Sequence, residues 1–91
     1  MDPASLVARQ LGLRIRAARQ LRKLTLQQLG KDTGLSAAYL SRVERGETAT
    51  SIANLIAITT RLDVPLRDLF EDNNDAYRPR YYTVARAADR A

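Results

Sequence analysis

Apolar residues recur at helical spacing along most of this 91-residue chain, and glycines divide the pattern into short segments. Leu11, Ile15 and Ala18 lie three or four positions apart, as residues on one face of an α-helix do. Gly34 and Gly46 each follow such a segment, where glycine can adopt the positive φ that ends a helix. Since a half-buried strand requires a period of two, this spacing predicts an all-α chain that folds as one small domain.

Residues that start helices stand before the predicted segments. Pro3 and Ser5 stand where the first helix could begin. Thr25, with Gln28 three positions later, has the capping-box pattern, and Ser36 and Ser51 precede the third and fourth segments. The caps and the apolar spacing together predict five short helices between about residue 6 and residue 71.

The last two predicted helices are separated by Asp63-Val64-Pro65, and Pro65 suits the first turn of the fifth helix. Their apolar residues, which we expect to face the core, are Ile52, Leu55, Ile58 and Leu62 in the fourth helix and Leu66, Leu69 and Phe70 in the fifth.

The formal net charge of +5 is unevenly spread along the chain. Residues 9–23 contain basic residues and no acid, whereas residues 63–75 contain acidic residues and the single base Arg67. A small basic domain favours a polyanionic partner such as a nucleic acid. The alternative is that the arginines only solvate a helix face.

Cysteine and histidine are absent, which removes disulfides, thiol nucleophiles, the commonest acid–base side chain and the usual zinc ligands. The sequence shows no glycine-rich phosphate loop and no close pair of carboxylates in a plausible cleft. We therefore expect no enzyme, no metal and no cofactor. Asp72 and Asp75 lie in a predicted linker, where solvated charge is a simpler interpretation than a magnesium site.

The chain has no apolar run that approaches the roughly 18 residues of a membrane span. Its first residues lack the long apolar region of a signal peptide. We expect a cytoplasmic protein with no membrane partner, and the absence of cysteine fits a reducing compartment.

Residues 25–46 have the pattern of two short helices joined by a tight turn that contains glycine. Leu29, Leu35, Leu40 and Val43 can bury together if the helices pack near perpendicular, which is helix-turn-helix geometry. At about 100° per residue, the second helix then presents a separate face that points away from Leu40 and Val43. This face contains Ala38, Ser41, Arg42 and Arg45, with Tyr39 beside it.

Small side chains mixed with arginine suit a helix that enters the major groove of DNA. An alanine methyl can touch thymine, a hydroxyl can donate or accept, and an arginine can grip guanine O6 and N7. Ser36, at the helix start, adds a hydroxyl and backbone N–H groups that suit a phosphate. The alternative is an ordinary helix hairpin whose outer face has no ligand.

The stretch "LGLRIRAARQLRKLTLQQLGKDTGLSAAYLSRVERGE" resembles the Xre, or lambdoid phage repressor-like, helix-turn-helix family. The matching positions are Leu24-Thr25, Leu29, Gly34-Leu35-Ser36, Leu40-Ser41 and Glu44-Arg45-Gly46, and "IANLIAITTRLDVPLRDLF" matches the family's fourth and fifth helices. The resemblance implies a five-helix, lambda-repressor-like DNA-binding domain over residues 10–71. Residues 1–9 would then be an N-terminal extension with the start of helix 1, and residues 72–91 a linker and C-terminal tail.

The resemblance also implies that the recognition helix, residues 36–45, meets DNA with its start and its exposed face. The positions that match family contacts to bases or phosphates are Ser36, Ala37, Ala38, Tyr39, Ser41, Arg42 and Arg45. Of these, Tyr39 and Arg45 match frequent contacts to the DNA backbone. Arg19 and Glu44 match an ion pair that braces the first helix against the recognition helix, which is a structural role.

Some positions depart from the family pattern. Leu26 stands where the family often has a glutamine that contacts phosphate, so we expect Gln27 or Gln28 to take that contact. Ala49-Thr50 replaces the family's Asn-Pro, and the link in front of it has no lysine or arginine. With two alanines at the start of the recognition helix, specificity would depend on Arg42, methyl contacts and DNA shape.

The tail contains strand-forming residues at Tyr81–Val84. A strand of this length is not stable alone, so it must pair with another chain, pair with further sequence or be disordered. The segment is similar to the start of the cupin sensor that follows this domain in many family members. We expect a natural short regulator rather than the excised DNA-binding part of a longer one.

The sequence therefore predicts a transcriptional regulator, a repressor, that binds a palindromic operator in double-stranded DNA as a homodimer. Its half-sites would lie about one helical turn apart. Dimerisation is expected through the fifth helix or through strand exchange by Tyr81–Val84. The alternative is an antitoxin or a protein-binding regulatory adaptor with the same fold, whose protein partner docks on the acidic stretch 63–75 and the tail.

Overall fold

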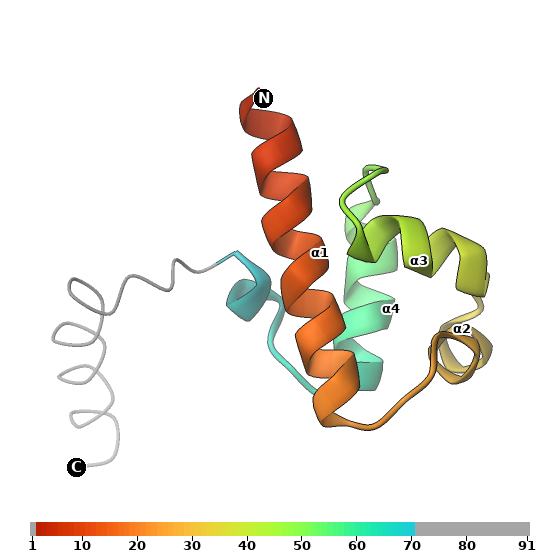
Figure 1. Cartoon of the computed structure of the whole chain (residues 1–91). Helices are drawn as coiled ribbons and strands as arrows, with labels where there is room; N and C mark the ends of the chain where they lie inside the picture. Colours follow the sequence, from red (N-terminus) through yellow and green to blue (C-terminus); the bar gives the residue numbers. More distant parts are fainter. Residues whose placement is uncertain (1, 71–91) are drawn as a thin grey trace, which may run out of the picture.

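The computed structural model describes residues 2–70, which form α-helices joined by short links and no strand (Figure 1). The elements are α1 (Pro3–Leu21), α2 (Leu26–Thr33), α3 (Ala37–Glu44), α4 (Ile52–Leu62) and the 3₁₀ turn η1 (Leu66–Leu69). The prediction of an all-α fold is confirmed over this range. None of these helices is long and apolar enough to span a membrane. The strand predicted at Tyr81–Val84 and the acidic residues from Glu71 onward lie outside the described residues.

Helices α2, α3 and α4 begin where the sequence predicted, because local caps satisfy their terminal backbone groups. The predicted capping box is present: the Gln28 amide donates to Thr25 Oγ1 at 3.0 Å, and the Thr25 amide donates to Gln28 Oε1 at 2.8 Å. Ser36 and Ser51 cap α3 and α4 in the same manner. Gly34 ends α2 with φ 79°.

Helix α1 is longer than the short first helix that the sequence suggested. It starts at Pro3 and continues for 19 residues. The physical reason is the cap at Asp2, whose side chain accepts a hydrogen bond from the Ser5 amide at 2.8 Å. The helix therefore runs without a break through the predicted junction between residues 1–9 and 10–71, and its first turns extend beyond the other helices in Figure 1.

One apolar core joins all the elements. It consists of Leu11, Ile15, Leu29, Leu40, Val43, Leu55, Ile58, Leu62 and Leu69. Helices α2 and α3 contribute Leu29 and Leu40, both with no exposed surface, and α1 and α4 cover them from behind. The single buried hydroxyl of α4 is satisfied inside its own helix, because Thr59 Oγ1 donates to the Leu55 carbonyl at 2.9 Å.

Two residues expected in the core are exposed instead. Ile52 is 59% exposed and Phe70 is 50% exposed. Ile52 lies roughly 70° around α4 from the centre of the buried face, at 100° per residue. The fifth helix is a 3₁₀ turn with three residues per turn, so Leu66 and Leu69 share its inner side and Phe70 turns away from it.

Helix α1 crosses the end of α3 at Gly12, where the two backbones come very close. A Cβ atom on Gly12 would lie 2.4 Å from the carbonyl oxygens of both Val43 and Glu44. Gly30 has a similar role in α2, since its Cβ would lie 2.4 Å from the Leu35 carbonyl oxygen. These two glycines let α3 sit directly against α1 and α2.

We expect Gly12→Ala to destabilise the fold although alanine is the better helix former. The gain in helix propensity is about 1 kcal/mol, whereas forcing a methyl against two backbone carbonyls costs roughly 1–3 kcal/mol or more. Denaturant unfolding measures the difference. The control is Gln10→Ala on the exposed side of α1, which should change the unfolding free energy by no more than about 0.5 kcal/mol. Equal stability of both variants would contradict the close crossing.

Candidate nucleic-acid interface

Helices α2 and α3 form a helix-turn-helix. Leu29 and Leu40 are fully buried between them, and Leu35 in the turn packs on the same core. Gly34 provides the left-handed residue of the turn, and the missing side chain of Gly30 allows the Leu35 carbonyl to approach α2. The apolar side of α3 is therefore buried in the core, and its other side faces solvent.

The exposed side of α3 contains the residues that the sequence grouped together. Ala38, Arg42 and Arg45 are exposed and Ser41 is half-buried, whereas Val43 on the opposite side is 2% exposed. The structure thus brings two small side chains and two guanidinium groups onto one helix face, which we call the α3 face (Ala38, Ser41, Arg42 and Arg45).

The start of α3 is exposed as well. Ser36 Oγ accepts a hydrogen bond from the Tyr39 amide at 3.0 Å, so it caps the helix and keeps its own hydroxyl hydrogen as a donor. Ala37 follows it at the first helical position and is half-buried. This end of α3 can meet an anion through the Ser36 hydroxyl and the helix N-terminus together.

Tyr39 is tied into the protein more firmly than the sequence indicated. Its hydroxyl donates to Thr50 Oγ1 at 2.6 Å and accepts from Asn54 Nδ2 at 3.1 Å. The ring thereby connects α3 to the link before α4 and to the first turn of α4. Sequence reasoning missed Thr50 and Asn54 as partners, because nothing in their spacing from Tyr39 predicts that they meet.

Arg45 is also engaged within the protein. Its Nε donates to Glu47 Oε2 at 2.9 Å, its Nη2 donates to Glu47 Oε1 at 3.1 Å, and its Nη1 donates to Ser41 Oγ. These hydrogen bonds raise the pKa of Arg45 above its ordinary value and lower the pKa of Glu47 below its own. The sequence analysis did not single out Glu47, although it lies only two positions after Arg45.

A buried ion pair supports the α3 face from behind. Arg19 Nε and Nη2 donate to the two oxygens of Glu44 at 2.7 and 3.0 Å, and Arg19 Nη1 donates to the Leu24 carbonyl at 2.7 Å. The side chains are only 12% and 5% exposed. The structure therefore brings together the two residues that the sequence paired, and the hydrogen bond to Glu44 raises the pKa of Arg19.

The first turn of α2 presents two glutamines to solvent. Gln27 and Gln28 are both exposed, and Gln28 uses its side-chain oxygen in the capping box, which leaves its amide nitrogen as a donor. Leu26, which stands in place of the family's glutamine, packs half-buried against the core. The departure at Leu26 thus exchanges an exposed polar group for core contact.

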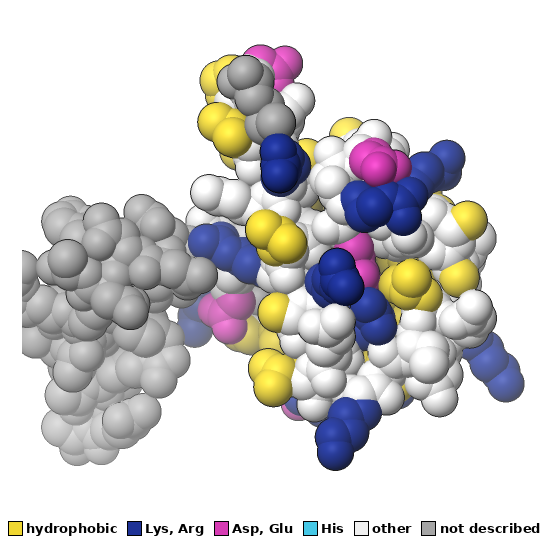
Figure 2. Space-filling view, viewed as in Figure 1, with side chains coloured by type: hydrophobic (Ala, Val, Ile, Leu, Met, Phe, Trp, Pro, Cys, Tyr) yellow, Lys and Arg dark blue, Asp and Glu magenta, His cyan; other side chains and the backbone are white. Residues whose placement is uncertain are grey.

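Basic side chains are distributed over the side of the molecule that Figure 2 shows, with acidic side chains among them. Some of the arginines have acidic partners on the surface: Arg22 pairs with Asp63 at 3.2 Å, and Arg61 pairs with Asp32. Asp63 belongs to the acidic stretch 63–75 that the sequence proposed as a docking site, and its charge is shared with Arg22.

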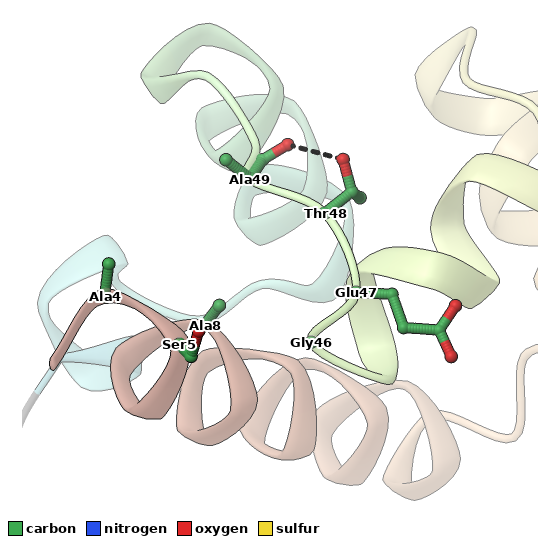
Figure 3. A pocket seen from close by; sticks show the side chains of 7 residues that line it. All are labelled: Ala4, Ser5, Ala8, Gly46, Glu47, Thr48 and Ala49. Atoms are coloured by element: carbon green, nitrogen blue, oxygen red, sulfur yellow. Dashed lines mark hydrogen bonds between the residues drawn. The ribbon is translucent and has the colours of Figure 1, made fainter. Parts of the chain in front are cut away.

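A shallow hollow of about 210 Å³ lies between the first turns of α1 and the link that follows α3 (Figure 3). Its lining consists of Ala4, Ser5, Ala8, Gly46, Glu47, Thr48 and Ala49. Glu47 is the only titratable side chain in this lining, and Figure 3 shows its carboxylate pointing away from Ala4, Ser5 and Ala8 and lying alongside α3. The hollow thus brings together no pair of catalytic groups.

The fold and the α3 face define a helix-turn-helix domain. A family model of helix-turn-helix proteins, HTH_3, matches residues 15–69. The chain belongs to this family, which agrees with the resemblance found in the sequence. The curated relative SutR, an HTH-type transcriptional regulator of Escherichia coli, is 39% identical over 59 residues, which is 65% of this chain and 33% of SutR. The chain thus spans about a third of that relative's length.

Two solved structures of similar fold are a controller protein and a regulator. The restriction-modification controller protein C.AhdI of Aeromonas hydrophila superposes with a TM-score of 0.66 at 32% identity, covering 68% of this chain and 94% of C.AhdI. SinR of Bacillus subtilis, a master regulator for biofilm formation solved in complex with DNA, superposes with a TM-score of 0.64 at 32% identity, covering 67% and 98% of the two chains.

We expect Glu44→Gln to destabilise the protein by about 3 kcal/mol, because it leaves the Arg19 charge buried without its counter-ion. Denaturant unfolding measures this loss. The matched control is Asp63→Asn, which removes one charge from the exposed pair with Arg22 and should cost less than about 1 kcal/mol. If the two substitutions cost the same, the Arg19–Glu44 pair does not brace the fold.

Proposed function

We propose that this chain is a sequence-specific transcriptional regulator, acting as a repressor, that binds double-stranded DNA through the recognition helix, residues 36–45. The observation that carries the proposal is the α3 face, which combines small side chains with guanidinium groups on a helix held by a buried core. SutR is named as a transcriptional regulator and SinR was solved with DNA, which supports the same class of function for this chain.

The chemistry of the face assigns roles to its residues. Ala38 is small enough for the helix to approach the bases and can touch a thymine methyl, and Arg42 can donate two hydrogen bonds to guanine O6 and N7. Ser36 and Ala37 meet phosphate and the first base edges at the helix start. Ser41 lies one turn before Arg45, from which its hydroxyl oxygen accepts a hydrogen bond, and the hydroxyl can contact a base or a phosphate.

Residues around the face hold the DNA backbone. Gln27 and Gln28 offer amide donors from the first turn of α2. Arg45 can contact a phosphate when it exchanges one of its present partners, and Tyr39 positions the flank of the interface through its hydrogen bonds to α4 and the link before it. These contacts orient the protein, whereas Arg42 reads sequence.

A homodimer on a palindromic operator is the second part of the proposal, because one domain of this size makes too few contacts for tight specific binding. Phe70 supports it: this large apolar side chain is half-exposed at the end of η1, in the region that the sequence assigned to dimerisation. The protein-binding alternative remains a prediction, since most of the acidic stretch and the tail lie outside the described residues.

Selection of the purified chain on a pool of randomised duplex DNA, near physiological salt, tests the proposal. We expect an enriched palindrome whose half-sites lie about one helical turn apart. Salt-sensitive binding with no enriched sequence would contradict a sequence-specific regulator made by this chain alone. It would instead favour the antitoxin or adaptor function.

Arg42→Ala and Arg45→Ala should both weaken DNA binding, but they should affect its sequence preference and its salt dependence differently. Loss of Arg42 should cost about 1–3 kcal/mol of binding and relax preference at one base pair. Loss of Arg45 should weaken binding to the selected site and to each of its single-base changes by the same factor, and should flatten the dependence of affinity on salt. Titrations of both variants against the selected site and its single-base changes measure the contrast. Unchanged preference at every position in Arg42→Ala would remove Arg42 from the readout.

A further inference from the structure

Glu47 places a carboxylate against the proposed DNA-binding face. It lies three residues after Glu44, the last residue of α3, its side chain is 53% exposed, and both of its oxygens accept hydrogen bonds from Arg45 at 2.9 and 3.1 Å. The carboxylate lies alongside α3 and points away from the small residues of α1 (Figure 3). An acidic group in this position is unexpected on a surface that would meet phosphates.

The pairing engages every nitrogen of the Arg45 guanidinium. Nε and Nη2 bind Glu47, and Nη1 binds Ser41 Oγ. The positive charge of Arg42 also acts on Glu47 and adds to the effect of Arg45 in keeping its pKa low. The Glu47 carboxylate therefore interacts with two of the basic residues that we assign to DNA binding. A phosphate must displace this carboxylate before it can accept hydrogen bonds from all of the Arg45 donors.

We propose that Glu47 is a specificity-determining residue: it competes with DNA phosphates for the Arg45 guanidinium and thereby suppresses binding to non-cognate DNA. The inference rests on the proposed function of the α3 face and concerns how that face discriminates between sequences. Glu47 acts through Arg45 and is a positioning residue that touches no base.

The two modes of DNA binding respond differently to this competition. Binding to non-cognate DNA consists almost entirely of contacts between basic side chains and phosphates, so an arginine held by a carboxylate contributes little to it. In the cognate complex α3 lies in the groove, and the Glu47 and Ser41 contacts hold Arg45 in a fixed position that does not have to be ordered on binding. Releasing Arg45 should therefore strengthen non-cognate binding more than cognate binding.

The test compares Glu47→Gln with Asp68→Asn, which makes the same change in net charge at an exposed position on η1. Both variants are titrated against the selected site and against a random duplex at several salt concentrations. For Glu47→Gln we expect affinity for the random duplex to rise roughly threefold to tenfold, with a salt dependence steeper by about 0.9, one phosphate contact. Affinity for the selected site should change less than about twofold, so the specificity ratio falls.

The control and a double variant separate the explanations. Asp68→Asn should leave the specificity ratio unchanged, because Asp68 is exposed on η1, outside the α3 face, and its charge is screened by salt. In a background that carries Arg45→Gln, adding Glu47→Gln should no longer raise the affinity for the random duplex. A double-mutant cycle requires this result if Glu47 acts through Arg45. Thermal unfolding of each variant checks that the fold is intact.

Three results would overturn the inference. Equal gains on both DNAs for Glu47→Gln and Asp68→Asn would show a net-charge effect only. A gain that persists without Arg45 would exclude competition for its guanidinium. A loss confined to the selected site would show that Glu47 reads a base, for which a carboxylate accepting from cytosine N4 is the natural contact. Failure of the unmodified chain to bind any duplex would instead refute the proposed function itself, and the inference with it.

Discussion

The buried ion pair between Arg19 and Glu44 fixes the position of the recognition helix. Removing two charges from water is costly, and the cost is offset only when the geometry satisfies their hydrogen bonds. Here both oxygens of Glu44 accept from Arg19, and the remaining Arg19 nitrogen donates to the Leu24 carbonyl. Because one guanidinium joins α1, the link to α2 and the last residue of α3, any other placement of α3 would leave a buried charge unpaired.

With α3 held in this way, its two sides have separate roles. Leu40 and Val43 complete the core, whereas no residue of the α3 face belongs to the core, and this face is available for a ligand. The groups around that face are already ordered by the protein, since Tyr39 is bound to Thr50 and Asn54 and Arg45 is bound to Glu47 and Ser41. Fewer side chains then lose conformational freedom when a ligand binds. This favours binding that depends on a fixed arrangement of side chains over binding by charge attraction alone.

Much of the fold was predictable because its signals are local. The capping box at Thr25 and the caps at Ser36 and Ser51 involve residues three positions apart, and the core of α2 and α3 follows from helical spacing. Prediction was wrong at Ile52 and Phe70, where an apolar residue was assigned to the core on hydrophobicity alone. Ile52 is exposed because it lies away from the centre of the buried face of α4. Phe70 is exposed because the tighter 3₁₀ winding of η1 turns it away from Leu66 and Leu69.

The candidate site divides along the same line. The sequence by itself determined where the helices start and stop, which residues of α3 share a face, and that the chain has the pattern of its family, because these properties depend on residues close together in the chain. Only the tertiary structure decided that Gly12 must lack a side chain, that Tyr39 is fastened to α4, and that Arg45 is held by Glu47. These contacts depend on how closely separate segments approach one another or on the path of the backbone after a helix ends. The spacing of residues in the sequence specifies neither of these.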